Sequence, residues 1–240
     1  MRTISLLFIV FFSTEILFAG SSKCAEDHSY LQFDSDKNYT IESLQKMLQK
    51  EPDDVECMVK LVDLYLKRGE VSKGFALLAK AYKKDPKFVK SKKISKIVHV
   101  ALYINKLEND AKTKNDAKSW NLLGLNYYKM GVFKEAVKCY RKSLKIDPSQ
   151  IDARLNLAVA LSRIGQKYMA IEELDKVIQR DKNNFYAYYY SGKILKYQIG
   201  DKNRAKKFLN IAKKLCREQK DKFPKKVYGL YMKDLESETK

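Results

Sequence analysis

Apolar residues recur with helical spacing along most of this chain, in short stretches separated by polar turns. Residues 117–150 show the pattern most clearly, because two such stretches stand side by side there. The first has small or apolar residues at Trp120, Leu123, Gly124 and Tyr127, and the second has them at Ala136, Tyr140, Ser143 and Leu144. Gly131 lies between them as a helix stop, and Asp147-Pro148 ends the second. The pattern predicts two short helices joined by a tight turn.

The same plan recurs upstream and downstream in a constant register. Pro52 and Pro86 are 34 residues apart, and residues 151–184 and 185–218 again place small residues where two helices would cross. We therefore divide an array over residues 40–222 into a partial unit at 40–54, a full unit at 55–88, a degenerate unit at 89–116 and full units at 117–150, 151–184 and 185–218.

This succession resembles the tetratricopeptide repeat family, whose units are about 34 residues of helix–turn–helix. The resemblance implies an all-α fold, a right-handed α-solenoid in which stacked hairpins share one core and a terminal helix covers its end. It gives structural roles in packing and turns to Trp120, Leu123, Gly124, Tyr127, Ala136, Tyr140, Pro148, Ala158, Ala170, Gly192 and Ala205.

Two units depart from the regular plan. Gly192 and Gly200 are one residue further apart than Gly124 and Gly131, which predicts a small insertion before the turn of the unit 185–218. The unit 89–116 is too short for a full repeat and has no Gly or Pro, so it predicts either one long helix or two helices with a tight turn. After the array, Pro224 opens the predicted capping helix and tail at 223–240.

The first 20 residues are predicted to be a targeting segment and not part of the folded array. Residues 1–20 combine Arg2, an apolar run and small residues at the end, which favours a cleaved signal peptide. An uncleaved anchor and a lipid attached to Cys24 are the alternatives, and the cysteine lacks a good lipoprotein motif. Residues 21–39 predict a flexible lead-in, and Thr40 predicts the N-cap of a helix from Ile41. We thus expect export to the periplasm or cell envelope of a bacterium.

The chain is strongly basic, with a formal net charge of +19. Such an excess attracts anionic partners. Because 40 of the 48 basic residues are lysines, a solvated lysine-rich exterior explains part of this charge without any ligand. Recognition of an anionic component of the envelope is the second interpretation, and nucleic acid binding is disfavoured by the expected export.

No pattern in the sequence supports catalysis. The four cysteines, Cys24, Cys57, Cys139 and Cys216, are widely and irregularly spaced, which favours neither a disulfide framework nor a metal site. His28 and His99 are the two histidines, and the chain has no nucleophile elbow or phosphate loop. We predict a non-enzymatic protein without metal or cofactor.

The resemblance also implies where a partner would bind, because in this family the first helices of successive units line a concave groove. By repeat register, the residues facing that groove are Asn121, Leu125, Tyr128, Lys129, Leu155, Val159, Ser162, Arg163, Tyr186, Tyr189, Lys193 and Tyr197. The tyrosines would give large amphipathic contacts, and the lysines and Arg163 would attract acidic groups. The set of residues with which some family members clamp a terminal carboxylate is missing here.

The sequence therefore predicts a protein-binding scaffold of the periplasm or cell envelope, which holds a partner segment, acidic in character, in its groove. The alternative is a peripheral envelope protein that uses a lysine-rich face to bind anionic lipid or cell-wall polymer. The two differ in their sensitivity to salt, which should be steep only for the second.

Overall fold

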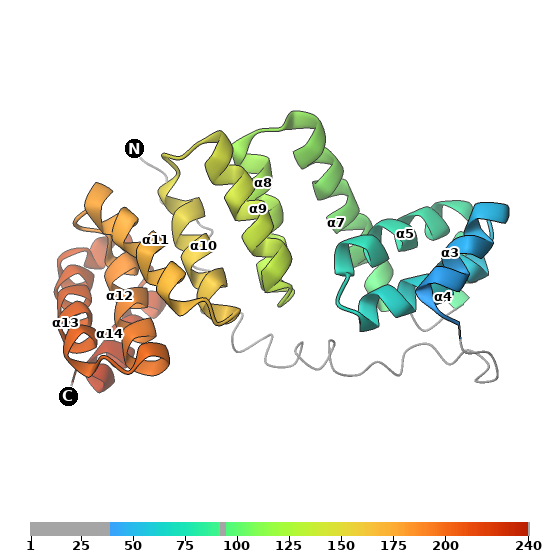
Figure 1. Ribbon diagram of the computed structural model, residues 1–240. Helices are drawn as coiled ribbons and strands as arrows, with labels where there is room; N and C mark the ends of the chain where they lie inside the picture. The colour runs from blue at the N-terminus through green and yellow to red at the C-terminus, as the bar shows by residue number, and fades with distance from the viewer. Residues whose placement is uncertain (1–38, 92–94, 240) are drawn as a thin grey trace. The chain divides into compact units, whose positions relative to one another are not determined.

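The computed structural model describes residues 39–91 and 95–239, and every regular element within them is helical (Figure 1). The all-α prediction is confirmed. The helices form two compact units, one within residues 20–126 and the other within residues 127–240, and the boundary falls inside α8 (Ala117–Lys129). The predicted signal peptide at 1–20 and nearly all of the predicted lead-in at 21–39 lie outside the described residues.

The N-terminal unit begins with a capped helix. Its elements are α3 (Ile41–Lys50), α4 (Val55–Lys67), α5 (Val71–Lys84), α6 (Pro86–Ser91) and α7 (Ser95–Lys114). Thr40 and Ser43 form a capping box, in which each backbone N–H donates to the other residue's hydroxyl, at 3.0 and 3.1 Å. The predicted cap at Thr40 is confirmed. The partial unit is thus a single helix, α3, which packs its buried Leu44 against Cys57 and Leu61 of α4.

The degenerate segment contains two helices of unequal length. The short α6 starts at Pro86, where the missing N–H of proline costs nothing because the first helical N–H groups have no partner. The 20-residue α7 follows and turns Val98, Ala101 and Ile104 inward. Its main partner is α5, so it covers the side of the preceding hairpin that a regular repeat would otherwise cover.

The C-terminal unit is a succession of hairpins. After the end of α8 it contains α9 (Phe133–Ile146), α10 (Ile151–Arg163), α11 (Lys167–Arg180), α12 (Phe185–Ile194), a π-helical turn η1 (Leu195–Ile199), α13 (Lys202–Glu218), a 3₁₀ turn η2 (Lys220–Lys222) and α14 (Lys225–Glu238). From α9 to α14 each α-helix packs on the next, and the first helices of successive repeats, α10 and α12, also meet. This is the stacking that the repeat pattern predicted.

The turns inside the hairpins share one geometry. Gly69, Gly131 and Gly165 have φ values of +76°, +76° and +79°, in the left-handed region that costs glycine little. At each turn the same pair of backbone bonds closes the first helix, as in Gly131 N–H to Tyr128 C=O and Val132 N–H to Tyr127 C=O, both 2.9 Å. The predicted turn positions are confirmed.

The close helix crossings also lie where the small residues predicted them. Ala136, Ala158, Ala170 and Ala205 are completely buried. The crossing at Gly192 is close, because a Cβ atom there would lie 2.5 Å from Leu209 Cγ. α12 and α13 therefore approach one another more closely than any larger residue at position 192 would allow.

The extra residue of the unit 185–218 is absorbed without a loop. Residues Leu195–Ile199 form a π-helical turn, and Gly200 closes it at φ +89° with its N–H bonded to Leu195 C=O at 2.8 Å. A π turn accommodates one additional residue while the helix keeps its direction. The insertion predicted from the glycine spacing is thus located at the end of the first helix of this repeat.

Candidate partner-binding face

The C-terminal ends of three successive first helices are joined by side-chain hydrogen bonds. Arg163 Nε at the end of α10 donates to the Tyr128 hydroxyl at the end of α8, at 3.3 Å. Gln198 Nε2 in η1 donates to Ser162 Oγ at 3.3 Å, and Lys167 Nζ donates to the backbone oxygen of Gln198 at 2.7 Å. We call Tyr128, Ser162, Arg163, Tyr197 and Gln198 the helix-end row.

The helix-end row is accessible and mixed in character. The ring of Tyr197 is 63% exposed, and Arg163 and Gln198 are exposed as well. Tyr128 is half-buried because its ring packs on Phe133, with ring centroids 5.2 Å apart. The half-buried Lys129 follows Tyr128 in the chain. The row therefore offers aromatic surface with a guanidinium beside it, a combination suited to binding a protein segment.

Four residues expected in the groove lie inside the array instead. Leu125, Leu155, Val159 and Tyr189 are at most 8% exposed. Their side chains fill the spaces between helices, because an apolar residue on a first helix also faces the neighbouring repeat. The structure corrects their assignment, and they support a binding face without forming it.

The remaining predicted residues divide between the two units. Asn121 is half-buried in the N-terminal unit. Tyr186 is half-buried in the C-terminal unit and packs its ring against Phe223 and Tyr231, with ring centroids 6.2 and 6.0 Å away. Burial raises the pKa of Tyr186 to about 12, so its hydroxyl stays protonated at neutral pH.

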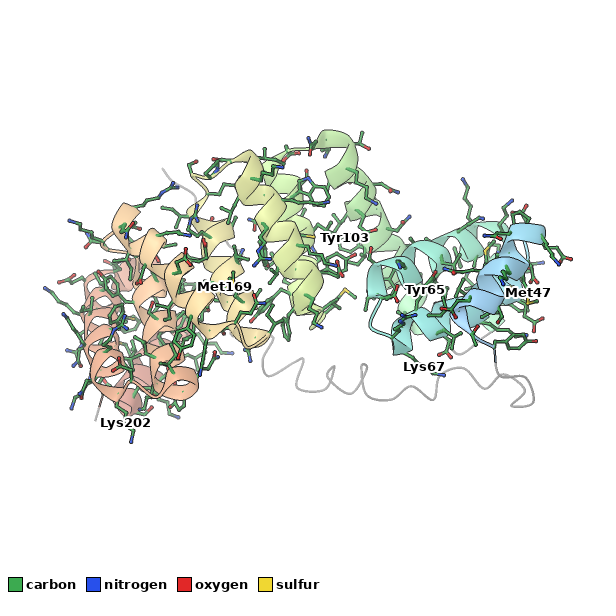
Figure 2. All side chains as sticks on the ribbon, viewed as in Figure 1. Met47, Tyr65, Lys67, Tyr103, Met169 and Lys202 are labelled. Atoms are coloured by element: carbon green, nitrogen blue, oxygen red, sulfur yellow. The ribbon has the colours of Figure 1, made fainter. Side chains whose placement is uncertain are left out.

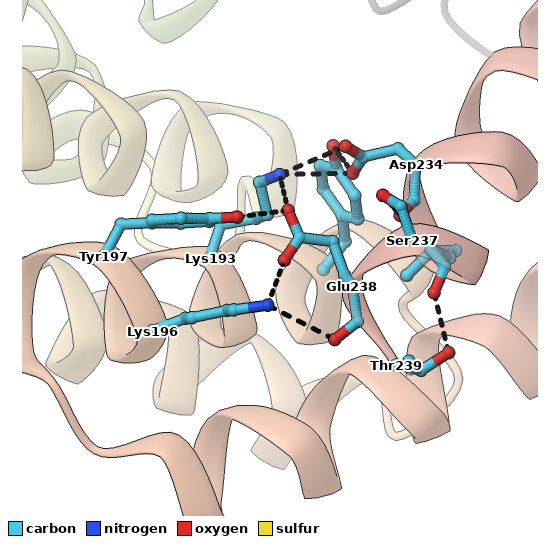
Figure 3. A network of polar contacts seen from close by, with 9 residues as sticks. Lys193, Lys196, Tyr197, Asp234, Ser237, Glu238 and Thr239 are labelled. Atoms are coloured by element: carbon cyan, nitrogen blue, oxygen red, sulfur yellow. Dashed lines mark hydrogen bonds and ion pairs between the residues drawn. The ribbon is translucent and has the colours of Figure 1, made fainter.

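The polar ends of the other residues on α12 and η1 are engaged by the capping helix α14 (Figure 3). Lys193 Nζ lies 3.2 Å from Asp234 Oδ1 and 2.7 Å from Glu238 Oε1. Lys196 Nζ and the Tyr197 hydroxyl each donate to the Glu238 carboxylate at 2.6 Å. The Tyr189 hydroxyl donates to Asp234 at 2.7 Å. In this structure Tyr189, Lys193 and Tyr197 thus hold the protein's own carboxylates.

The electrostatics of this network follow from its geometry. The Glu238 side chain is 7% exposed, and burial pushes its pKa upward. Hydrogen bonds from Lys193, Lys196 and Tyr197 outweigh burial and hold the pKa of Glu238 at about 2. Glu238 is therefore ionised at neutral pH, and its bonds fix the last turn of α14.

Sequence reasoning missed the network although a signal was present. Asp234 and Glu238 are four residues apart on a predicted helix, so they share one face. The repeat register placed Lys193 and Tyr197, also four apart, on a face of α12. The register of the repeats does not say that a terminal helix 40 residues later lies against that face.

The described residues offer little for other chemistry. No three of their His, Cys, Asp or Glu side chains gather as metal ligands. Cys57, Cys139 and Cys216 are buried thiols, and burial raises the pKa of the Cys216 thiol to about 11. Within the same residues no helix is both long and apolar enough to cross a bilayer. Cys24 lies outside the described residues.

Comparison with known proteins identifies the repeats. One family model, described as TPR repeat, matches residues 124–165, and a second, described as tetratricopeptide repeat, matches residues 151–184. The TPR repeat-containing protein MJ1428 of Methanocaldococcus jannaschii is 30% identical over 87 residues, 36% of this chain and 15% of its own length. The N-terminal acetyltransferase A complex auxiliary subunit NAA15 of Arabidopsis thaliana is 43% identical over 49 residues, 19% of this chain and 6% of its own length. The chain thus spans a small part of either relative.

Solved structures give similar matches at low identity. MamA is 19% identical, with 76% of this chain and 90% of that chain covered and a TM-score of 0.42. YrrB, a TPR protein with an unusual peptide-binding site, is 17% identical, with 73% and 93% covered and a TM-score of 0.43.

Proposed function

Because the chain is a tetratricopeptide repeat protein, we propose that it is a non-enzymatic scaffold that binds a segment of a partner protein along the helix-end row. Repeat arrays of this kind use rigid, extended surfaces for binding. The proposal depends mainly on one observation, the direct bonds that connect Tyr128, Arg163, Ser162 and Gln198 across successive repeats. These bonds hold aromatic and basic groups at fixed spacing before any partner arrives, which lowers the entropic cost of binding.

The chemistry of the row indicates the kind of segment it would take. Exposed Tyr197 provides apolar contact, and Arg163 provides a planar donor for carboxylates. We infer a partner segment that combines apolar side chains with acidic ones. The basic excess of the chain would increase the rate of encounter with such a segment.

We further propose that the protein acts in the periplasm or cell envelope of a bacterium. The support is the apolar run and small residues of positions 1–20, which are typical of a secretory signal. N-terminal sequencing of the protein recovered from cell fractions tests this directly. A cytoplasmic protein that keeps Met1 would contradict it.

The binding site is tested by crosslinking followed by substitution. A photoreactive residue at position 197 in intact cells should label a protein partner, which is then purified. Replacing Tyr128, Arg163 and Tyr197 by Ala together should weaken binding of this partner at least tenfold, because truncated aromatic and Arg contacts each cost about 1 kcal/mol or more. Tyr103, 50% exposed on α7, provides the matched control, and Tyr103→Ala should bind normally. A triple variant that binds as the parent does, with unchanged circular dichroism, would move the site elsewhere.

A further inference from the structure

The positive charge of the chain is clustered, and residues 202–226 form one of its most basic segments. Between Lys202 and Lys226 eleven residues are basic and two, Glu218 and Asp221, are acidic. This segment carries a net charge of +9, almost half of the chain's +19, in about a tenth of its length. A lysine-rich composition alone would spread its charge evenly, so this concentration calls for a structural explanation.

The structure places much of this charge on the solvent-facing side of α13 and η2. We define the basic band as Lys202, Lys206, Lys207, Lys214, Arg217 and Lys220, all exposed. At 3.6 residues per turn the members on α13 fall within an arc of roughly 140°, centred on the side of the helix away from the buried Ala205 and Ala212. Lys202 lies at the outer edge of its unit in Figure 2. None of these residues belongs to the helix-end row.

Few acidic groups neutralise the band. Lys214 Nζ lies 3.8 Å from Glu218 Oε1, which is long for an ion pair, and both side chains are more than half exposed. Arg204 is left out of the band because Asp201 lies 3.9 Å away and Asp175 also interacts with it. Four or more lysines thus project toward solvent along a helix that is about 25 Å long.

The side chains in and around the basic band favour some classes of partner over others. No large hydrophobic side chain is exposed between residues 201 and 226, whereas the centre of a protein interface needs apolar or aromatic anchors. Binding of single-stranded nucleic acid needs exposed aromatic rings for stacking, and readout of duplex bases combines Arg or Lys contacts to guanine with amide contacts to adenine. Nine of the eleven basic residues in this segment are lysines, which act as point charges without fixed geometry.

We propose that the basic band docks the protein on the surface of an anionic phospholipid bilayer. A row of exposed lysines without apolar anchors fits a flat, negatively charged surface, where each lysine contributes about 1 kcal/mol. Binding is peripheral and electrostatic, and the chain does not insert there. The helix-end row remains available to a protein partner, so the site is independent of the scaffold function.

Vesicle sedimentation with the full chain tests the proposal. The protein should bind vesicles of equal parts phosphatidylglycerol and phosphatidylcholine and leave pure phosphatidylcholine vesicles alone, and binding should fall steeply as salt rises from about 0.05 M to about 0.3 M. Changing Lys202, Lys206, Lys207 and Lys214 to Gln should weaken partitioning by up to about three orders of magnitude. The same four lysines changed to Arg should retain binding, because charge and not side-chain identity matters.

The matched control removes four exposed lysines elsewhere, with Lys46, Lys50, Lys134 and Lys145 changed to Gln. This variant has the same net charge as the first and should lose far less affinity. Equal losses in the two variants would show that net charge acts diffusely and would overturn the band as a site. Absence of vesicle binding by the parent would overturn it too. Tight binding of a duplex oligonucleotide at a salt concentration that releases the vesicles would assign the band to nucleic acid instead.

Discussion

Replacing Gly192 by Ala sets two effects against each other. Ala has the higher helix propensity, but its Cβ atom must fit between α12 and α13. In a helix Ala is favoured over Gly by about 1 kcal/mol. In this structure a Cβ at position 192 would lie 2.5 Å from Leu209 Cγ, 2.7 Å from its Cδ2 and 3.3 Å from its backbone nitrogen. The nearest atom is the branching carbon of Leu209, and its backbone is close behind, so neither moves easily.

The two effects can be compared in size. Forcing one extra carbon into a packed core costs about 1–3 kcal/mol, and the short distance at this crossing points to the upper end. After subtraction of the helical gain, we expect Gly192→Ala to destabilise the last hairpin by about 2 kcal/mol. Gly229→Ala is the control, because position 229 on α14 has no heavy atom within 4 Å of the added Cβ. That variant should gain up to about 1 kcal/mol.

The assay must observe the last hairpin itself. The sole tryptophan, Trp120, belongs to the N-terminal unit, and repeat arrays open locally, so fluorescence would miss the change. Amide hydrogen exchange of peptides within residues 185–218 reports on α12 and α13. These peptides should exchange about 30-fold faster in Gly192→Ala, and less so when Leu209 is also Ala. Protection equal to that of the parent would refute the close crossing.

Other perturbations test the turns, the network and the cap. Gly131→Ala forces alanine to φ near +76°, which should cost about 1–2 kcal/mol in urea unfolding, with less loss for Asn; equal stability would contradict a left-handed turn. The pKa of Glu238 falls from 4.5 to about 2 on folding, so its ionised form stabilises the fold above pH 4.5 and this gain is lost as the pH falls toward 2. Glu238→Gln should therefore melt earlier than the parent at pH 6, with a smaller deficit at pH 3 that nearly disappears by pH 2, and a deficit independent of pH would argue against the network. Deleting residues 223–240 removes Tyr231 and Leu235 from the cluster around Phe185 and should lower the melting temperature and solubility; unchanged melting would show that α14 does not dock.

The hairpins could be predicted because their determinants are local. Gly131 and Pro148 end helices by their own backbone properties, and Thr40 caps one with its own side chain. The longer spacing from Gly192 to Gly200 likewise revealed an extra residue. That residue became a π turn and not a loop because Leu195 is buried and its carbonyl accepts the Gly200 N–H, which is a matter of tertiary packing.

The binding face was predicted less well because it depends on contacts between distant segments. Register places Leu155 and Tyr189 on a first helix, but their burial depends on the neighbouring repeat and on α14. Lys193 reaches a carboxylate 45 residues away, and no periodicity encodes such a pair. In contrast, Tyr128, Arg163 and Tyr197 were predicted on the same side of the array, and the first two are within hydrogen-bonding distance.

The three buried thiols make it possible to measure how often individual helical hairpins open. Cys57 lies in α4, Cys139 in α9 and Cys216 in α13, so each sits in a different hairpin. Because a cysteine reacts as the thiolate and only when a reagent reaches it, alkylation of each one requires its hairpin to open first. Mass spectrometry of the three modified peptides over time would therefore rank the opening rates of three hairpins along the array without any introduced label.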